Sequence, residues 1–233
     1  MSVRQAAMAQ RGSDGVRPAR GLPVETHRSA HAAAFCAGGL LQALLLHLLL
    51  IVFFLTLALL VALPLFFCLF FSPPGNTETV AGYISAATGI DAQDIGDVGA
   101  GIADFDGIIC GAPTWHTGAD TERSGTVWDE FIYGELEGLD LKGKKVAIFG
   151  LGDSGGYGDN FCDAMDELAT CFKARGADII GSVSTDGYEF EESKSVAGGK
   201  FVGLACDEDN QPDMSEERVG AWISQLKSEG MPL

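Results

Sequence analysis

The last two thirds of the chain predict an α/β fold in which a parallel sheet is covered by helices on both faces. Short apolar runs alternate there with segments of helical periodicity. Strands separated by helices lie parallel, because each connection has to cross over the sheet. A stretch of about 160 residues is also within the usual size of one domain with its own core.

The predicted elements follow one another along this part of the chain. Gly176 supplies a C-terminal stop for the third helix, and Ser215 opens the last one. The apolar run at residues 65–71 has to serve as the first strand. Further strands are predicted at residues 107–110, 145–149, 178–183 and 201–205, and helices at residues 77–88, 127–133, 160–175 and 215–229.

The first 71 residues differ in chemistry from the rest. They contain 5 Lys+Arg and 2 Asp+Glu, whereas the remainder contains 10 and 30, so the two parts carry charges of +3 and −20 within a total of −17. No charged residue occurs between Arg28 and Glu78. We therefore divide the chain into an Arg- and Ala-rich, targeting-like or disordered segment at 1–39, an apolar helix at 40–63 and an α/β domain at 64–233.

The apolar segment has three interpretations. Residues 41–63 provide the roughly 20 apolar residues of a transmembrane helix or membrane anchor, which Pro64 would end. Arginines, many alanines and few acids precede this segment, and such a composition resembles an organelle transit peptide that is later removed. The third interpretation is a misplaced translation start or a retained intron. The expected location is accordingly the plastid (chloroplast) stroma or a membrane.

Charge and cysteine usage exclude some functions. A domain with a net charge of −20 has no basic stripe to meet nucleic-acid phosphates, and it favours basic docking partners instead. The six cysteines form no CxxC pair and have no spacing that suits zinc or an iron–sulfur cluster. We interpret them as buried thiols in a reducing compartment.

Three loops carry the candidate chemistry, since ligands of parallel sheets bind beyond the carboxyl ends of the strands. Residues 72–77 lie between an apolar run and a helix, where backbone N–H groups attract a phosphate. Residues 113–118 and 150–160 each follow a strand and present one aromatic side chain, Trp115 and Tyr157. Two aromatic rings from neighbouring loops would clamp a flat ring between them.

These loops resemble those of the flavodoxins. The matching segments are Gly75-Asn-Thr-Glu-Thr-Val-Ala81, Gly111-Ala-Pro-Thr-Trp115, Gly152-Asp-Ser-Gly-Gly-Tyr-Gly-Asp-Asn-Phe161, Ser184-Thr-Asp-Gly-Tyr188 and Gly199-Lys-Phe-Val-Gly-Leu-Ala-Cys-Asp-Glu-Asp-Asn210. Residues 185–200 resemble the insertion that splits the fifth strand of the long-chain, algal and cyanobacterial class. The resemblance implies a flavodoxin-like three-layer sandwich with a five-stranded parallel sheet in the order 2-1-3-4-5, here preceded by an N-terminal apolar helix.

The resemblance implies non-covalently bound FMN and a low-potential one-electron carrier rather than an enzyme. Trp115 and Tyr157 would cover the two faces of the flavin ring, and the peptide that follows His116 would face flavin N5. Many relatives have Asn at the position of His116. The expected cofactor-binding residues are Ser72, Gly75, Asn76, Thr77, Thr114, Trp115, His116, Thr117, Gly118, Gly152, Asp153, Tyr157, Asp159 and Asn160.

The resemblance also implies the partners. Flavodoxins exchange electrons with ferredoxin–NADP reductase and photosystem I, and acids such as Asp120 and Glu122 would steer basic partners of that kind. The same negative charge disfavours a further negative charge on a reduced ring, which lowers its reduction potential. We expect a monomer with no catalytic residue and no bound metal.

The phosphate loop departs from the family pattern. That loop usually reads Ser/Thr-x-Thr-Gly-Asn-Thr, and here Pro73 and Pro74 occupy its second and third positions. Proline has no N–H group, so two backbone donors and one hydroxyl are lost. Each hydrogen bond to a charged group is worth about 1.5–3 kcal/mol. We therefore expect weak FMN binding or none, and nanomolar binding in a fluorescence titration would refute that hypothesis.

Two other functions stay open on the same fold. One is an FMN-dependent quinone or NAD(P)H reductase, which would carry out two-electron chemistry as an oligomer. The long-chain insertion and the strong acidity argue against it. The other is a membrane-tethered flavodoxin-like domain that has lost FMN, supported only by the two prolines; such a protein would purify colourless.

Overall fold

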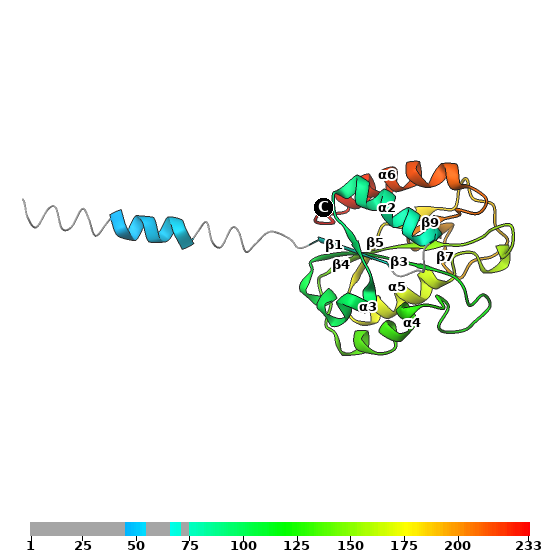
Figure 1. The fold of residues 1–233 in the computed structure, drawn as a ribbon, viewed down its shortest axis with the longest axis horizontal. Coiled ribbons are helices and arrows are strands. Elements are labelled where there is room, and N and C mark those ends of the chain that lie inside the picture. Colours follow the sequence, from blue (N-terminus) through cyan, green and yellow to red (C-terminus); the bar gives the residue numbers. More distant parts are fainter. Residues whose placement is uncertain (1–44, 55–65, 71–74) are drawn as a thin grey trace, which may run out of the picture. The chain divides into compact units, whose positions relative to one another are not determined.

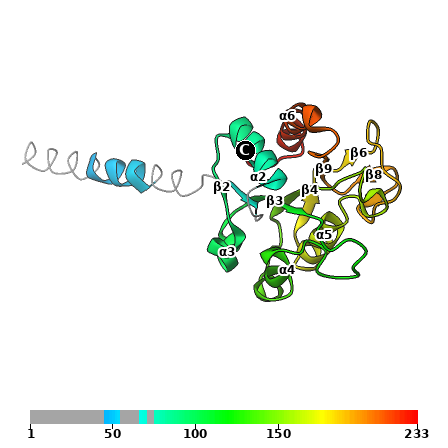
Figure 2. The ribbon, with the colours of Figure 1, turned by 45° about the vertical axis from the view of Figure 1, so that its right-hand side comes forward.

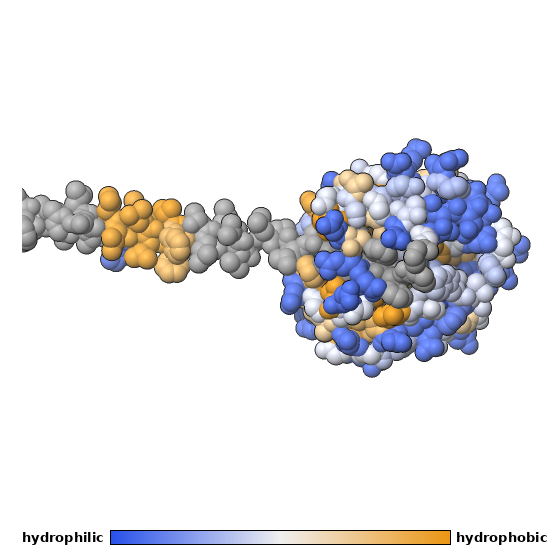
Figure 3. Space-filling model, viewed as in Figure 1, coloured by the Kyte–Doolittle hydropathy of each residue, from blue (hydrophilic) through white to orange (hydrophobic). Residues whose placement is uncertain are grey.

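The computed structural model of this chain describes residues 45–54, 66–70 (backbone) and 75–233, and the chain divides into two compact units, Met1–Ala62 and Leu63–Leu233. In the first unit, residues 45–54 form a helix with exposed apolar side chains, whose surface is mostly hydrophobic in Figure 3. None of the helices in the described ranges combines the length and apolar character that crossing a membrane requires. The rest of the predicted 41–63 span lies outside the described residues.

The second unit is a parallel sheet between two layers of helices (Figure 1). Its strands run in the order β2-β1-β3-β4-β5, with β9 also beside β4, which confirms the predicted order. The strands of this sheet are β1 (Phe66–Phe70), β2 (Ala92–Gln93), β3 (Gly107–Pro113), β4 (Lys145–Leu151), β5 (Asp178–Ile180) and β9 (Leu204–Cys206).

The fifth strand is split in two, as predicted from the insertion. β5 pairs with the first half of β4 and β9 with its second half. The predicted strands at 178–183 and 201–205 therefore each divide between two sheets, and the first is interrupted by Gly181, whose φ of +83° is incompatible with an extended strand. A separate antiparallel sheet is formed by β6 (Val183–Ser184), β7 (Val196–Ala197) and β8 (Lys200–Phe201).

Helices cover both faces of the parallel sheet (Figures 1 and 2). One face carries α2 (Asn76–Thr88) and α6 (Pro212–Ser228). The other carries α3 (Ile95–Val98), α4 (Val127–Ile132) and α5 (Ala164–Ala174). Short 3₁₀ turns complete the unit at η1 (Gly99–Asp104), η2 (Glu135–Gly138) and η3 (Gly158–Asn160).

Each face of the sheet has its own buried core. Along β4, Val146 and Ile148 join the cluster on the α5 side, whereas Ala147 and Phe149 join the cluster on the α2 and α6 side. Successive side chains of a strand point to opposite faces, so a run with no polar residue fits a strand that is covered on both sides. Trp128 and Trp222 are fully buried members of the two clusters.

The strands β3 and β4 extend further toward their C-terminal ends than the sequence predicts. The two strands stay in register to their last pair, Pro113 with Leu151, and so continue past the predicted ends at 110 and 149. Glycines and a proline in these last positions disguise the strands in the sequence, because such residues are typical of loops. This extension carries both strands to the rim of the site described below.

Two helices begin elsewhere than predicted. α5 begins at Ala164 rather than at residue 160, because η3 and a turn come first and Cys162 has a φ of +56°. α6 begins at Pro212, since proline suits the first turn of a helix, where its missing N–H group is not needed. Ser215, predicted to open α6, is instead fully buried within it.

Candidate functional site

The register of the sheet brings three loops to one edge. Phe70 of β1 lies opposite Gly111 of β3, and Pro113 lies opposite Leu151 of β4, so the segments that follow these strands begin near one another. The start of α2 and the loops after β3, β4 and β9 line a cavity of ≈ 380 Å³. The residues that line it are Gly75, Asn76, Thr77, Pro113, Thr114, Trp115, Thr117, Leu151, Gly152, Asp153, Tyr157, Asn160 and Asp209.

Most of the predicted site residues meet at this cavity. Those that line it are Gly75, Asn76, Thr77, Thr114, Trp115, Thr117, Gly152, Asp153, Tyr157 and Asn160. His116, Gly118 and Asp159 do not line it, and Ser72 lies outside the described residues. His116 lines a neighbouring, open cavity of ≈ 580 Å³ together with Glu122, Glu130 and Tyr133.

Three lining residues were not predicted. Pro113 and Leu151 lie in the two predicted loops but were not among the expected cofactor-binding residues, and the structure places them at the last positions of β3 and β4. Asp209 reaches it from the loop after β9, more than 130 residues along the chain from its partner Asn76. The long-chain insertion would have been a usable signal for Asp209, since it places a strand end, β9, directly beside the end of β4.

Two exposed aromatic rings belong to this cavity. Trp115 is 51% exposed and Tyr157 is 54% exposed, whereas the other two tryptophans of the chain are buried. The two rings come from separate loops, after β3 and after β4, and both line the same space. Such a pair provides two apolar faces that a flat aromatic ligand could cover.

The Trp115 loop is hydrogen-bonded to the backbone of residues 122–124 and packs against Gly125. The Trp115 amide donates to the carbonyl of Ser124 (3.4 Å), and the His116 amide donates to that of Arg123 (3.2 Å). Nδ1 of His116 lies 2.8 Å from the carbonyl oxygen of Glu122 and donates to it. Gly125 has a φ of +67°, and a Cβ there would lie 3.0 Å from Cβ of Trp115, so this close approach requires glycine.

The loop after β4 is equally constrained. A Cβ at Gly152 would lie 2.6 Å from the ring of Phe161, so only glycine fits against it. Oδ1 of Asp153 accepts hydrogen bonds from the side chain of Asn210 (2.9 Å) and the Gly156 amide (2.8 Å). These bonds, the one from Asn210 first, lower the pKa of Asp153. Asp153 is therefore a carboxylate at neutral pH and closes its own loop.

A buried carboxylate, Asp207, connects this loop to the end of β9. It is 1% exposed and accepts from the amide (3.2 Å) and the hydroxyl (2.5 Å) of Ser154. It also accepts from the Asn210 amide at 3.0 Å. Because a buried carboxylate is costly without such partners, these bonds fix the two loops relative to each other.

The start of α2 forms another part of the cavity wall. The N-cap, Gly75, offers no side-chain hydrogen bond to the first amides of the helix, so no cap side chain competes with an anion for those N–H groups. The side chain of Asn76 donates to Oδ2 of Asp209 (3.1 Å). Among the described lining residues there is no Lys or Arg, and the two charged groups, Asp153 and Asp209, are both acidic.

Comparisons with known proteins agree with this geometry. The family model described as Flavodoxin matches residues 69–222. The flavodoxin of Nostoc sp. (strain PCC 7120 / SAG 25.82 / UTEX 2576) is 44% identical over 159 residues, which cover 66% of this chain and 91% of the Nostoc protein. Flavodoxin 1 of Escherichia coli (strain K12) is 40% identical over 165 residues, which cover 69% of this chain and 91% of that protein.

A solved structure supports the same assignment. Fusobacterium nucleatum flavodoxin bound to flavin mononucleotide matches with a TM-score of 0.65 and 29% identity, over 70% of this chain and 97% of that chain. The matched family model covers the strands of the parallel sheet from β2 to β9. This chain belongs to the flavodoxin family.

Proposed function

We propose that this chain is an electron carrier that works through non-covalently bound FMN in the cavity at the start of α2. The observation that carries the proposal is the pair Trp115 and Tyr157: two exposed rings from separate loops line one cavity, in a chain that belongs to the flavodoxin family. An exposed tryptophan without a ligand would leave a large apolar surface in water.

The shape and chemistry of the cavity fit FMN. The aromatic pair suits a flat ring, and polar groups of Gly152, Asp153 and Thr114 suit its heteroatom edge. The first amides of α2 suit a phosphate, and Thr77, which is 1% exposed, places a hydroxyl there. The lack of a cation among the described lining residues fits a site that relies on N–H groups and hydroxyls.

Bound FMN would supply reversible one-electron exchange at its ring. The residues of the chain would tune and gate that exchange. Trp115 and Tyr157 would exclude water from the two ring faces, while Asp153 and Asp209 would make any added negative charge less favourable and so lower the reduction potential. His116 would hold the peptide that follows it, since its own ring is fixed by the Glu122 carbonyl.

A flavin titration tests the proposal directly. The purified protein should quench FMN fluorescence on binding, and a reductive titration should resolve two one-electron steps. A single two-electron step would favour the reductase alternative. A protein that purifies colourless and does not quench FMN fluorescence would favour a domain that has lost its cofactor.

We further propose that the carrier docks on basic redox partners, such as ferredoxin–NADP reductase or a photosystem I complex. The support is the net charge of −20 over residues 72–233 and the exposed acids Asp120, Glu122 and Glu130 around the Trp115 loop. Electron-transfer rates with such partners should fall as ionic strength rises. We expect a monomer, which size-exclusion chromatography with light scattering would test.

For location, we propose the plastid stroma, or a membrane-associated state in which the apolar N-terminal segment acts as an anchor. The support is the arginine-rich start of the sequence and the uncharged stretch between Arg28 and Glu78. N-terminal sequencing of the mature protein, combined with membrane fractionation, separates the two. A mature protein that starts near residue 64 in the soluble fraction would contradict the anchor.

A further inference from the structure

The strongest polar cluster outside the cavity is centred on Glu167 of α5. This carboxylate is 6% exposed, yet among the described residues no cationic side chain forms an ion pair with it. It accepts the backbone amides of Glu122 and Arg123, both at 2.8 Å, and the hydroxyl of Tyr133. A buried carboxylate needs such donors, so the chain segment that supplies them is held against α5.

The backbone of residues 122 and 123, which Glu167 binds, also holds the Trp115 loop. The carbonyl of Glu122 accepts from the His116 ring at 2.8 Å, and the carbonyl of Arg123 accepts from the His116 amide at 3.2 Å. The amides of residues 122 and 123 thus face α5 while their carbonyls face the 115–116 segment. A continuous path of hydrogen bonds therefore runs from the Glu167 carboxylate to the loop that carries Trp115.

We propose that Glu167 is a positioning residue of the flavin site, setting the place of Trp115 and His116 through the 122–123 backbone. The proposal rests on the proposed function, because it concerns the FMN-binding loop. Glu167 touches no part of the cavity itself. Replacing Glu167 would change the position of the Trp115 loop. It would not change the start of α2, where the phosphate is expected to bind.

Carboxylate chemistry makes Glu167 hard to replace. Its two oxygens each accept one backbone amide, and Oε1 accepts Tyr133 as well. A glutamine has one acceptor oxygen and one NH₂ donor, so the donor would face a backbone N–H group and repel it. Partial burial, followed by the hydrogen bond to Glu167, raises the pKa of Tyr133, which therefore stays a donor at neutral pH.

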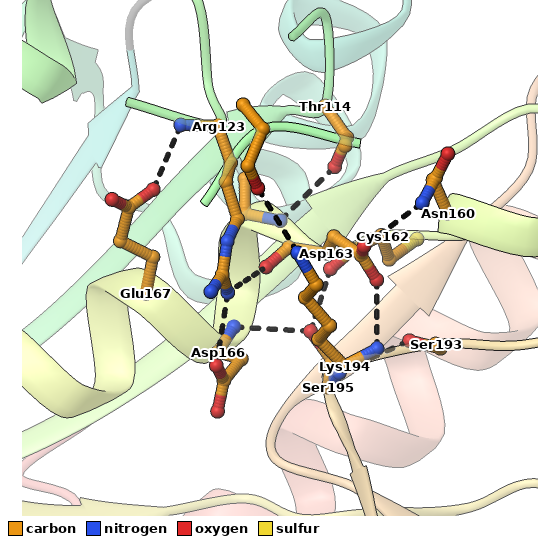
Figure 4. A network of polar contacts seen from close by, with 12 residues as sticks. Thr114, Arg123, Asn160, Cys162, Asp163, Asp166, Glu167, Ser193, Lys194 and Ser195 are labelled. Carbon is orange, nitrogen blue, oxygen red and sulfur yellow. Dashed lines mark hydrogen bonds and ion pairs between the residues drawn. The ribbon is translucent and has the colours of Figure 1, made fainter. Parts of the chain in front are cut away.

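Nearby groups provide matched controls. Arg123 forms an ion pair with Asp166 (2.9 Å), one residue before Glu167 on the same helix, as Figure 4 shows. Asp166→Asn removes one negative charge from the adjacent residue, whose side chain is 40% exposed, but leaves the amides of residues 122 and 123 bound. Tyr133→Phe removes the third donor of Glu167 and also leaves both amides bound.

The test compares the affinity for riboflavin, which has the flavin ring but no phosphate, with the affinity for FMN. Dissociation constants for FMN and for riboflavin, which lacks the phosphate, are measured for the wild type, Glu167→Gln, Asp166→Asn and Tyr133→Phe. Glu167→Gln should weaken both ligands by the same factor, about 10-fold or more. The FMN-to-riboflavin ratio should stay that of the wild type, and the two controls should change either ligand less than about three-fold.

The reduction potential of bound FMN gives a second reading. Glu167→Gln and Asp166→Asn each remove one negative charge. A shift of the reduction potential that occurs only in Glu167→Gln therefore reports a changed position of the Trp115 loop rather than the loss of a negative charge. Equal shifts in the two variants would overturn the proposal. Wild-type affinity in Glu167→Gln, or a loss confined to FMN, would overturn it too.

Two checks keep the outcome unambiguous. If Glu167→Gln does not fold, amide hydrogen exchange in the wild-type apoprotein decides: protected amides at residues 122 and 123 support the proposal, and exchange at the rate of an unfolded chain overturns it. If the wild type itself binds no flavin, the proposed function fails. The exchange experiment would still report on the hydrogen bonds of Glu167.

Discussion

Two parts of the cavity wall are constructed differently: the loops of Trp115 and Tyr157, here called the ring end, and the start of α2, here called the phosphate end, after the parts of FMN that are proposed to bind there. At the ring end, Trp115 and Tyr157 stand on loops that are held by buried carboxylates, Glu167 and Asp207. At the start of α2, where the phosphate of FMN is proposed to bind, the N-cap makes no side-chain hydrogen bond, and the side chain of Asn76 donates to the exposed acid Asp209. The ring end is thus preorganised, and the phosphate end relies on the ligand to satisfy its free amides.

Because of this difference, binding of the flavin ring and binding of the phosphate can be measured separately. Changes at the ring end should alter the binding of FMN and riboflavin together and should shift the reduction potential. Changes at the phosphate end should alter FMN binding alone. The ratio of the two dissociation constants therefore assigns any variant to one end, and each prediction below uses that ratio.

The largest effect is expected from removing both rings. In the double variant Trp115→Ala, Tyr157→Ala, both flavins should bind at least about 100-fold more weakly, because stacking on an aromatic side chain contributes about 1–3 kcal/mol per ring. The FMN-to-riboflavin ratio should be unchanged. Isothermal titration calorimetry with both ligands measures this, and Tyr83→Ala, on α2 and away from the cavity, serves as the control. A loss for FMN only would mean that the rings do not enclose the flavin.

A gain of binding is expected when the family's hydroxyl is restored. Pro74 lies outside the described residues, but its lack of an N–H group follows from the sequence. Pro74→Thr should tighten FMN by about 2 kcal/mol, roughly 30-fold, since it restores an amide and a hydroxyl for the phosphate. Riboflavin affinity should not change. Nanomolar FMN affinity in the wild type, with no gain in Pro74→Thr, would contradict the expected cost of the prolines.

A smaller gain is expected from Asp209. Its carboxylate lines the cavity and holds the side chain of Asn76 at the start of α2, where it would repel a phosphate. Asp209→Asn should tighten FMN by about 1 kcal/mol at low salt, roughly five-fold, and less at high salt. Asp213→Asn, an exposed acid on α6 that does not line the cavity, is the matched control. Equal gains in both variants would indicate a general charge effect rather than a local one.

The two aromatic residues of the ring end could be predicted from the sequence, whereas the buried carboxylates that hold their loops could not. Trp115, Tyr157 and the glycines of their loops stand out because each loop directly follows an apolar strand. Glu167 and Asp207 do not stand out, because an acid on a helix or in a loop has the composition of an ordinary surface residue. Each of them accepts a backbone amide from far along the chain, 44 residues away for Glu167 and 53 residues away for Asp207.

The strand order and the split fifth strand were also predictable, whereas several boundaries were not. β1 and α2 lie within one residue of their predicted limits, since each is a continuous pattern with a clear end. Turns that depend on a left-handed residue, such as Cys162 before α5, have no comparable signal, because a positive φ is rare for a non-glycine residue. Asp209 was missed for a related reason: β9 had to be placed beside β4 before its loop could be assigned to the cavity.

The smallest effect is expected from acid titration of the ring end. The folded-state pKa of Asp153 is lowered by Asn210 and then by the Gly156 amide, so its stabilising contribution is present above the ordinary value of 3.8 and is lost as pH falls through the lower folded value. The wild-type free energy of unfolding should therefore decline more steeply than that of Asp153→Asn between about pH 5 and pH 3. The decline should be modest, because this carboxylate is partly accessible to solvent. Urea unfolding of the apoprotein at each pH measures it, with Asp159→Asn on the same loop as the control. Parallel profiles for the wild type and Asp153→Asn would show that the Asn210 contact does not hold the Tyr157 loop, which would then depend on Asp207 and on its backbone hydrogen bonds.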